Sequence, residues 1–384
     1  MTDKFKLSQS WQDEVRVTLS GVYPGDDSNT FSSTARTDGT YLNFQNLQQK
    51  TLKAGSLFNN ANVGGIVSTY SLVYTGPEAY GGGVLALNGD IHFVPVRADR
   101  GQKISASGTV STYSLVYTTG YAYAGGVLAP NGDIHFVPHS ANRGQKISPN
   151  GVVSTYSLVY VAGGAYAGGV LAPNGDIHFV PINANRGQKI SANGTVGTYS
   201  LVYTTGSAYL GGVLAPNGDI HFVPLNANRG QKISANGAVS TYSLVYTTSL
   251  AYLGGVLAPN GDIHFIPYSA AVGQKISANG TVSTYSLIYT ASLAYRGGVL
   301  APNGDIHFIP YDGWVGQKVS ANGTVSTYSG VFVNGAGVYY GGVSASNGDI
   351  HFIPYYANRG QKISTLPAQN YSAAFFRSSI NSKV

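Results

Sequence analysis

The stretch that decides the fold is GGVLAPNGDIHFVPLNANRGQKISANGAVSTYSLVY, residues 211–246. It contains four short segments rich in β-branched and aromatic residues, which is typical of strands. They cover residues 211–215, 219–223, 231–234 and 239–246. Asn217-Gly218 and Asn236-Gly237 join the first segment to the second and the third to the fourth, and Asn-Gly pairs form tight hairpin turns because both residues tolerate positive φ. The stretch therefore predicts a four-stranded antiparallel meander.

The same unit recurs along the chain. Its core, Gly-Asp-Ile-His-Phe, occurs seven times, with histidine at positions 92, 135, 178, 221, 264, 307 and 351. The first five intervals are 43 residues and the last is 44, with the extra residue near 333–338. A period in the low forties with four strands per unit is typical of propeller blades. The sequence therefore predicts an all-β, seven-bladed β-propeller over residues 61–364.

The seventh unit lacks a fourth strand after Gln361-Lys362-Ile363-Ser364, but residues 66–74, IVSTYSLVY, repeat the pattern of the other fourth strands. Pairing of this amino-terminal strand with the last unit would close the ring and remove an open sheet edge. An open solenoid is the alternative architecture, but it leaves residues 66–74 without a partner. We therefore expect a closed ring.

The ends of the chain fall outside the repeat. Residues 1–60 are expected to form a non-repeat β arm or anchor, with strands over 14–19 and 40–44, and residues 365–384 an extended tail that packs with it. The absence of cysteine excludes disulfides and thiolate metal sites. No stretch has the length and apolarity of a signal peptide or a membrane span, so neither is expected.

The repeated aspartate and histidine first suggest catalysis or a metal site. However, they lie on the second strand of each blade, and seven second strands that fan outward cannot bring their side chains to one ion. We therefore predict a buried structural brace, with Asp219, Ser240, Thr241 and Tyr242 as possible partners of His221, and neither a metal nor a cofactor. The predicted brace residues are Asp90, His92, Asp133, His135, Asp176, His178, Asp219, His221, Asp262, His264, Asp305, His307, Asp349 and His351.

No enzyme motif is present: there is no Gly-x-Ser-x-Gly elbow, no His-Glu-x-x-His and no phosphate-binding loop. Glu14 and Glu78 are the two glutamates of the chain, and the repeated aspartates occupy equivalent positions, so the two carboxylates in different environments that a glycosidase needs are missing. The expectation is a protein that binds and does not catalyse.

The blades differ from one another mainly in two loops, which join strand two to strand three and strand four to the next blade. Both loops emerge at the same end of a meander, where aromatic and basic side chains would form a rim suited to sugars or a protein surface. The rim could alternatively only cover the blade ends. The candidates are Arg100, Arg143, Arg186, Arg229, Arg359, Trp314, Tyr123, Tyr166, Tyr209, Tyr252, Tyr295 and Tyr340. Nucleic acid is a weaker partner, because an aspartate offsets the lysine of each blade.

The repeat Ala-Pro-Asn-Gly-Asp-Ile-His-Phe-Val-Pro resembles the Ala-Pro-Asn-Gly-x-Ile-x-Phe-type repeats of seven-bladed propellers in microbial and viral proteins. Near-identical blades also resemble propeller lectins in architecture. The resemblance implies a virion structural or attachment protein, assembled in the host cytoplasm, whose partners are other virion proteins or host-surface glycans. Residues 1–60 could mediate homo-oligomer formation. The alternative is a free multivalent lectin, cytoplasmic or released without a signal.

Overall fold

The computed structural model describes residues 4–5, 42–43, 66–329 and 337–364. Two units are distinguished by their contacts, and the larger, Gly64–Pro367, contains the repeats. In the other, β1 (Lys4–Phe5) pairs antiparallel with β2 (Leu42–Asn43), which falls within the strand expected at 40–44. The rest of the predicted arm and the predicted tail, including the strand expected at 14–19, lie outside the described residues.

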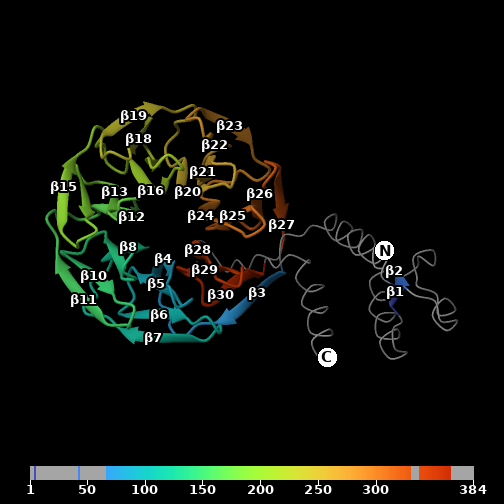
Figure 1. Ribbon diagram of the computed structural model, residues 1–384, viewed down its shortest axis with the longest axis horizontal. Helices are drawn as coiled ribbons and strands as arrows, with labels where there is room; N and C mark the ends of the chain where they lie inside the picture. Colours follow the sequence, from blue (N-terminus) through green and yellow to red (C-terminus); the bar gives the residue numbers. More distant parts are fainter. Residues whose placement is uncertain (1–3, 6–41, 44–65, 330–336, 365–384) are drawn as a thin grey trace. The chain divides into compact units, whose positions relative to one another are not determined.

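The larger unit consists of seven four-stranded antiparallel sheets arranged around one axis (Figure 1). The seven-bladed propeller is therefore confirmed. Blade 1 is β4 (Tyr80–Leu85), β5 (Ile91–Pro95), β6 (Arg100–Ile104) and β7 (Val110–Ser114); blade 2 is β8 (Tyr123–Leu128), β9 (Ile134–Pro138), β10 (Arg143–Ile147) and β11 (Val153–Ser157). Blade 3 is β12 (Tyr166–Leu171), β13 (Ile177–Pro181), β14 (Arg186–Ile190) and β15 (Val196–Ser200); blade 4 is β16 (Tyr209–Leu214), β17 (Ile220–Pro224), β18 (Arg229–Ile233) and β19 (Val239–Ser243).

The remaining blades follow the same order. Blade 5 is β20 (Tyr252–Leu257), β21 (Ile263–Pro267), β22 (Val272–Ile276) and β23 (Val282–Ser286); blade 6 is β24 (Tyr295–Leu300), β25 (Ile306–Pro310), β26 (Gly316–Val319) and β27 (Val325–Tyr328). Blade 7 is β28 (Tyr339–Ser344), β29 (Ile350–Pro354), β30 (Arg359–Ser364) and β3 (Ile66–Ser71). The first strand of each blade lies nearest the axis and the fourth lies at the circumference (Figure 1).

Ring closure occurs where the sequence predicted it. Strand β3 pairs antiparallel with β30 from Ile66↔Ser364 to Ser71↔Arg359, so the two ends of the repeat region share blade 7. The hydroxyl of Tyr70, on β3, lies 3.3 Å from Nδ1 of His351, on β29. The amino-terminal strand therefore supplies both the backbone pairing and the side-chain contact that the other blades make internally.

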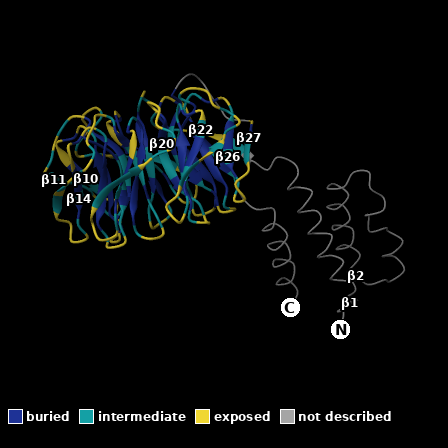
Figure 2. Ribbon diagram, turned by 90° about the horizontal axis from the view of Figure 1, so that it is seen from above, coloured by how far each residue is buried: buried dark blue, intermediate teal, exposed yellow. Residues whose placement is uncertain are grey.

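Blades pack face to face through apolar side chains. Between blades 4 and 5, Val213 and Val223 contact a cluster that includes Tyr252 and Phe265, both 0% exposed. Equivalent clusters fill the other seams, and the buried strands run through the middle of the disc while the loops and turns at its two faces are exposed (Figure 2). Burial of this kind is the main stabilising contribution, at about 25 cal/mol per Å² of apolar surface.

Each inner strand carries a β-bulge next to the axis. In blade 4 the pairing shifts between Tyr209 and Gly212, which leaves Gly211 at φ 95°. A Cβ on the equivalent Gly125 would lie 3.0 Å from Cα of Gly168, so neighbouring inner strands approach backbone to backbone. This close approach explains why glycine recurs there.

The seven blades have two distinct faces. Asn-Gly turns form one face, called here the turn face, and the loops between strands two and three and between successive blades form the other, called here the loop face. None of the described residues belongs to a helix long and apolar enough to span a membrane.

Candidate functional site

The repeat is broken most clearly on the loop face close to the axis. We call this group of residues the axial cluster: Glu78, Arg97, Tyr121, His139, Arg296, Tyr311, Tyr340, Tyr355 and Tyr356. Backbone hydrogen bonds position its loops, for example from Ala79 N to the carbonyl of Tyr355 (3.2 Å) and from Arg97 N to that of Glu78 (3.2 Å). Equivalent positions in other blades hold different side chains, so the cluster is asymmetric although the scaffold repeats.

Glu78 connects three blades in this cluster. Its carboxylate accepts hydrogen bonds from the hydroxyls of Tyr121 (2.5 Å) and Tyr356 (2.7 Å) and pairs with Nε of Arg97 at 2.5 Å. Burial alone would raise the pKa of Glu78, but the two tyrosine hydroxyls and the Arg97 charge outweigh it, so this pKa lies below its ordinary value. Glu78 is therefore ionised at neutral pH and fixes Tyr121 in place.

Arg296, on β24, lies within a group of tyrosine rings. Its guanidinium carbon is 3.4 Å from the centroid of Tyr340, 5.2 Å from that of Tyr311 and 5.6 Å from that of Tyr355. Cation–π contact of this kind stabilises a charge that is partly removed from water. Among the described residues no carboxylate lies within ion-pair distance of Arg296, and its buried Nε has no hydrogen-bond partner. Arg296 therefore keeps a positive charge that an anionic or carbonyl group could use.

His139, directly after β9, is the one histidine outside the Gly-Asp-Ile-His-Phe repeats. It is half-buried, its Nδ1 lies 3.1 Å from Oγ of Ser140, and its ring centroid is 6.4 Å from that of Tyr121. Burial lowers its pKa, a hydrogen bond to the Tyr121 backbone opposes this, and the charge of Arg296 lowers it further. His139 is therefore uncharged at neutral pH and can accept a proton.

Backbone strain coincides with this face. Five non-glycine residues occupy the left-handed region at equivalent positions of the inter-blade loops, and in two other blades glycine takes that position. The five are Glu78, Tyr121, Ser207, Leu250 and Leu293, with φ between 51° and 58°. Such residues cost of order 1 kcal/mol each and are concentrated at functional sites. The preceding blade supports several of them, for example through Asn183 Oδ1, which accepts a 2.8 Å hydrogen bond from Ser207 N.

The repeated aspartates and histidines lie elsewhere and are buried in every blade. In blade 4, Nδ1 of His221 is 3.2 Å from the hydroxyl of Tyr242, while Asp219 pairs with Lys232 at 2.6 Å. Of the partners considered for His221, the structure brings Tyr242 to it, and Asp219 belongs to a separate ion pair. Burial, assisted by the Lys232 charge, lowers the pKa of His221 to about 4. Among the described residues, no group of three or more histidine and acidic side chains is arranged to hold a metal ion.

The predicted rim residues fall into two groups in the structure, one at the surface and one in the core. Trp314 is 77% exposed, and Tyr340 lies under Arg296. Four of the arginines lie over tyrosine rings of the preceding blade, at 5.3–5.6 Å: Arg100, Arg143, Arg186 and Arg229. Arg359 begins β30 and is exposed.

Five of the rim tyrosines are not at the surface. The rings of Tyr123, Tyr166, Tyr209, Tyr252 and Tyr295 are 0% exposed. Each begins an inner strand, and its hydroxyl donates to a backbone carbonyl of its own blade, as Tyr209 does to Arg229 O at 3.0 Å. The expectation that these rings present stacking surface is therefore wrong. They belong to the core because the β-bulge extends the inner strand to include them.

Of the nine residues of the axial cluster, Tyr340 alone was among the site candidates predicted from the sequence, and the other eight were not: Glu78, Arg97, Tyr121, His139, Arg296, Tyr311, Tyr355 and Tyr356. The signal that identifies them is departure from the repeat at equivalent positions. The position of His139, for example, is occupied by Val96, Ile182, Leu225, Tyr268, Tyr311 and Tyr355 in the other blades.

Comparison with known proteins adds a family. The sequence model of the virginiamycin B lyase family matches residues 59–319. No curated protein sequence matches the chain. Among solved structures, a catalytically inactive histidine-to-alanine variant of virginiamycin B lyase from Staphylococcus aureus, determined with quinupristin, is 18% identical with a TM-score of 0.69, covering 78% of this chain and 99% of that one.

Two further structures have the same architecture. A streptogramin B lyase is 20% identical with a TM-score of 0.67, covering 77% of this chain and 96% of that one. The WD40 propeller domain of Doa1 is 14% identical with a TM-score of 0.61, and the match covers 78% of this chain and 97% of that domain. At these identities the structural likeness shows the fold alone.

The family match corrects the functional expectation. A non-enzymatic virion structural or attachment protein, and the alternative of a free lectin, are both wrong, because the matching family is one of lyases, which are enzymes. The absence of familiar catalytic motifs misled the interpretation, since chemistry on this scaffold does not require them. The match from residue 59 to residue 319 spans well over half of the 384 residues, and the chain belongs to the virginiamycin B lyase family.

Proposed function

We propose that this protein is a lyase whose reaction takes place at the axial cluster. A lyase breaks a bond by elimination, which requires a base to remove a proton and a positive group to stabilise the negative charge that develops. His139 and Arg296 fit these two roles, since one is uncharged at neutral pH and the other has no carboxylate partner among the described residues. This pairing, at the place where the repeat is broken, is the observation that supports the proposal most strongly.

In the proposed step, the uncharged ring of His139 removes a proton from a carbon next to a carbonyl group of the substrate. The electron pair from the C–H bond forms a double bond as the bond to the leaving group on the neighbouring carbon breaks. Arg296 stabilises the charge on the carbonyl oxygen during this step. His139 then carries the proton and can return it to the leaving group.

The other residues of the cluster position these two. Glu78 holds the Tyr121 hydroxyl through a 2.5 Å hydrogen bond, and Tyr121 contacts His139 through its ring and its backbone. The rings of Tyr340 and Tyr355, which contact each other, hold the guanidinium of Arg296 by cation–π contact. The structure of the relative determined with quinupristin, inactive after loss of a histidine, motivates streptogramins of that kind as the first substrates to test.

The test is to incubate the full chain with virginiamycin B or quinupristin and to weigh the products by mass spectrometry. Elimination leaves the total mass unchanged, whereas hydrolysis adds one water. His139→Ala should reduce kcat/KM by a factor of about 100 or more, and Arg296→Gln by about 100. Ile182→Ala, which removes the equivalent side chain of the next blade, serves as the matched control and should have little effect. Absence of turnover by the unaltered chain, or full activity of His139→Ala, would refute the proposal.

A further inference from the structure

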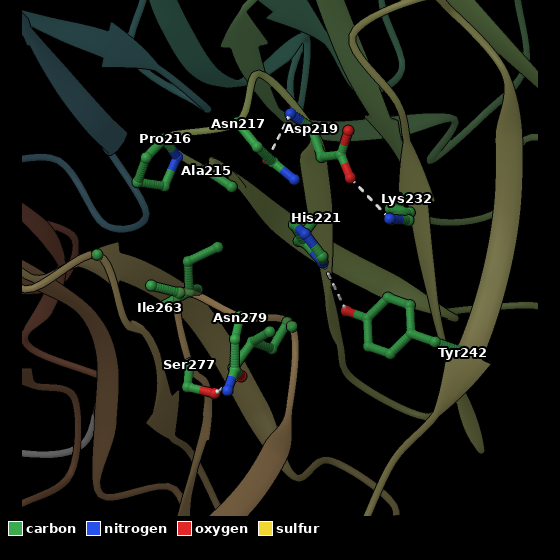
Figure 3. Close-up of a pocket in the computed structure, with 14 residues that line it drawn as sticks. Ala215, Pro216, Asn217, Asp219, His221, Lys232, Tyr242, Ile263, Ser277 and Asn279 are labelled. Carbon is green, nitrogen blue, oxygen red and sulfur yellow. Dashed lines mark hydrogen bonds and ion pairs between the residues drawn. The ribbon is translucent and has the colours of Figure 1, made fainter.

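A second kind of site lies on the turn face, between neighbouring blades and away from the axial cluster. A hollow of about 220 Å³ separates blades 4 and 5, lined by Asn217, His221 and Lys232 on one side and by Ile263, Ser277 and Asn279 on the other (Figure 3). An equivalent hollow of about 280 Å³ lies between blades 1 and 2, lined by residues that include Asn88, Lys103 and Asn150. The hollow is therefore a product of the repeat, and it is independent of the proposed lyase reaction.

The asparagine amides at its edge have fixed orientations. Oδ1 of Asn217 accepts a hydrogen bond from Asp219 N (3.1 Å), and Oδ1 of Asn279 accepts from Thr281 N (3.0 Å) and from the hydroxyl of Ser277 (2.6 Å). The oxygens are engaged in the turns and Asn217 also hydrogen-bonds the Asp219 side chain, so the second N–H of Asn217 and the NH₂ group of Asn279 are left for other partners. Both asparagines are exposed, so a ligand arriving from solvent meets N–H donors first.

Lys232 adds a charged donor deeper in the hollow. Its ammonium donates one hydrogen bond to Asp219 Oδ2 at 2.6 Å and has two further N–H groups, and its side chain is 33% exposed. The ion pair cancels the charge of Asp219, and His221 is uncharged at neutral pH. The lining thus offers three donor groups around a site with no net negative charge.

A lining that offers an ammonium and amide N–H groups, and whose one carboxylate, Asp219, is paired with Lys232, suits a ligand with several acceptor oxygens. Oxyanions meet this requirement, since each oxygen can accept from an amide or an ammonium group at once. We propose that the inter-blade hollow binds a small oxyanion, namely phosphate or the phosphate group of a small ester, through Asn217, Lys232 and Asn279. The apolar wall formed by Ile263 leaves room for the organic part of an ester.

The chain contains its own controls, because only some seams have both asparagines. Five successive pairs of blades do: Asn88 with Asn150, Asn131 with Asn193, Asn174 with Asn236, Asn217 with Asn279, and Asn260 with Asn322. Between blades 7 and 1, Ser107 replaces the second asparagine opposite Asn347. The sequence after β30 contains no Asn-Gly pair to face Asn303, and the fourth strand of blade 7 comes from the other end of the repeat region. The proposal therefore predicts about five sites and not seven.

The experiment is equilibrium dialysis of the full chain against labelled inorganic phosphate, repeated with glycerol phosphate as the ester. We expect about five equivalents of phosphate at saturation. Asn279→Asp should remove one equivalent, because it keeps the oxygen that supports the turn and replaces the NH₂ donor with a charged oxygen. Tighter binding of the ester than of phosphate identifies an ester as the physiological form, and the reverse identifies free phosphate.

Ser107→Asp is the matched control, since it adds the same charge in an incomplete seam and should leave the number of sites unchanged. Ser107→Asn should add one site. Melting curves of each variant establish that the ring is folded. No binding of either anion, or the same stoichiometry in the unaltered chain and in Asn279→Asp, would overturn the proposal.

Discussion

Acid should unfold this ring over a pH range set by its seven buried histidines. The pKa of each is lowered from 6.5 to about 4, with burial as the largest cause. Between these two values the unfolded chain binds more protons than the folded one, so stability falls as the pH falls. The loss begins near pH 6.5 and is complete for each histidine below about pH 4.

The size of the effect follows from the pKa shift. With a pKa of 6.5 in the unfolded chain and about 4 in the folded ring, each histidine lowers the free energy of unfolding by about 2 kcal/mol at pH 5 relative to pH 8. Seven together cost about 14 kcal/mol, which is comparable with the whole stability of an ordinary domain, 5–15 kcal/mol. The ring should therefore be stable at pH 8 and lose most of its stability by about pH 5.

The assay is urea unfolding at a series of pH values, because the slope of the unfolding free energy against pH counts the protons taken up. His221→Gln should lower the number of protons taken up on unfolding by about one. It should also reduce the decrease in unfolding free energy between pH 8 and pH 5 by about 2 kcal/mol, after allowance for the contact with Tyr242 that the change weakens. A carboxylate origin is distinguishable, because the pKa values of Asp90, Asp176, Asp219, Asp262 and Asp349 are lowered and these groups reduce stability only as the pH falls through the ordinary aspartate range and below it. Equal stability at pH 8 and pH 5 would refute the buried, uncharged state of these histidines.

Three further changes test the ring and its loop face. Gly125→Ala should lower the free energy of unfolding of the ring by about 1–3 kcal/mol, because Gly125 has positive φ and lies where two inner strands approach closely. Gly120→Ala is the control: its Cβ would lie in open space, so the same thermal melt should show no change. Glu78→Gln should lower the free energy of unfolding by about 1–3 kcal/mol at pH 7 and by less as the pH falls below the ordinary glutamate range and through the lowered pKa of Glu78; an unchanged difference across pH would contradict an ionised Glu78. The double change Ser68→Pro and Thr69→Pro on β3 removes a backbone N–H that faces β30, since neighbouring N–H groups of a strand point in opposite directions, and should destabilise the ring by about 1–3 kcal/mol; a melt identical to that of the unaltered chain would argue against closure by this strand.

The fold could be predicted because its determinants are local and repeated. Asn-Gly pairs specify hairpins wherever they occur. Because blade 7 lacks a fourth strand of its own, β3, which has the fourth-strand pattern, could be predicted to complete it. The inner strands were placed less well, since each begins two residues earlier than the pattern indicated, at Tyr209 and not at Gly211 in blade 4. A bulge breaks the alternation on which strand prediction depends, and so the sequence pattern places Tyr209 in a loop.

The candidate site could not be predicted by the same means. Repetition directed attention to Asp219, His221 and their equivalents, which a ring of identical blades must bury and pair in the same way seven times. Chemistry that removes a proton from one substrate requires a base and a charge in different environments, as His139 and Arg296 are. In a repeat protein such a pair can only be found among positions where the blades differ.

The axial end of the loop face is also where differences cost the fold least. Each blade contacts only its two neighbours through its packed faces, so a side chain changed in one inter-blade loop leaves the other seams intact. The five left-handed non-glycine residues show that strain of order 1 kcal/mol is tolerated at each of these loops. The axis then brings the loops of all blades together, which is how a charge on Arg296 of blade 6 reaches His139 of blade 2. A symmetric ring thus provides a frame in which a few unequal residues, far apart in sequence, influence one another electrostatically.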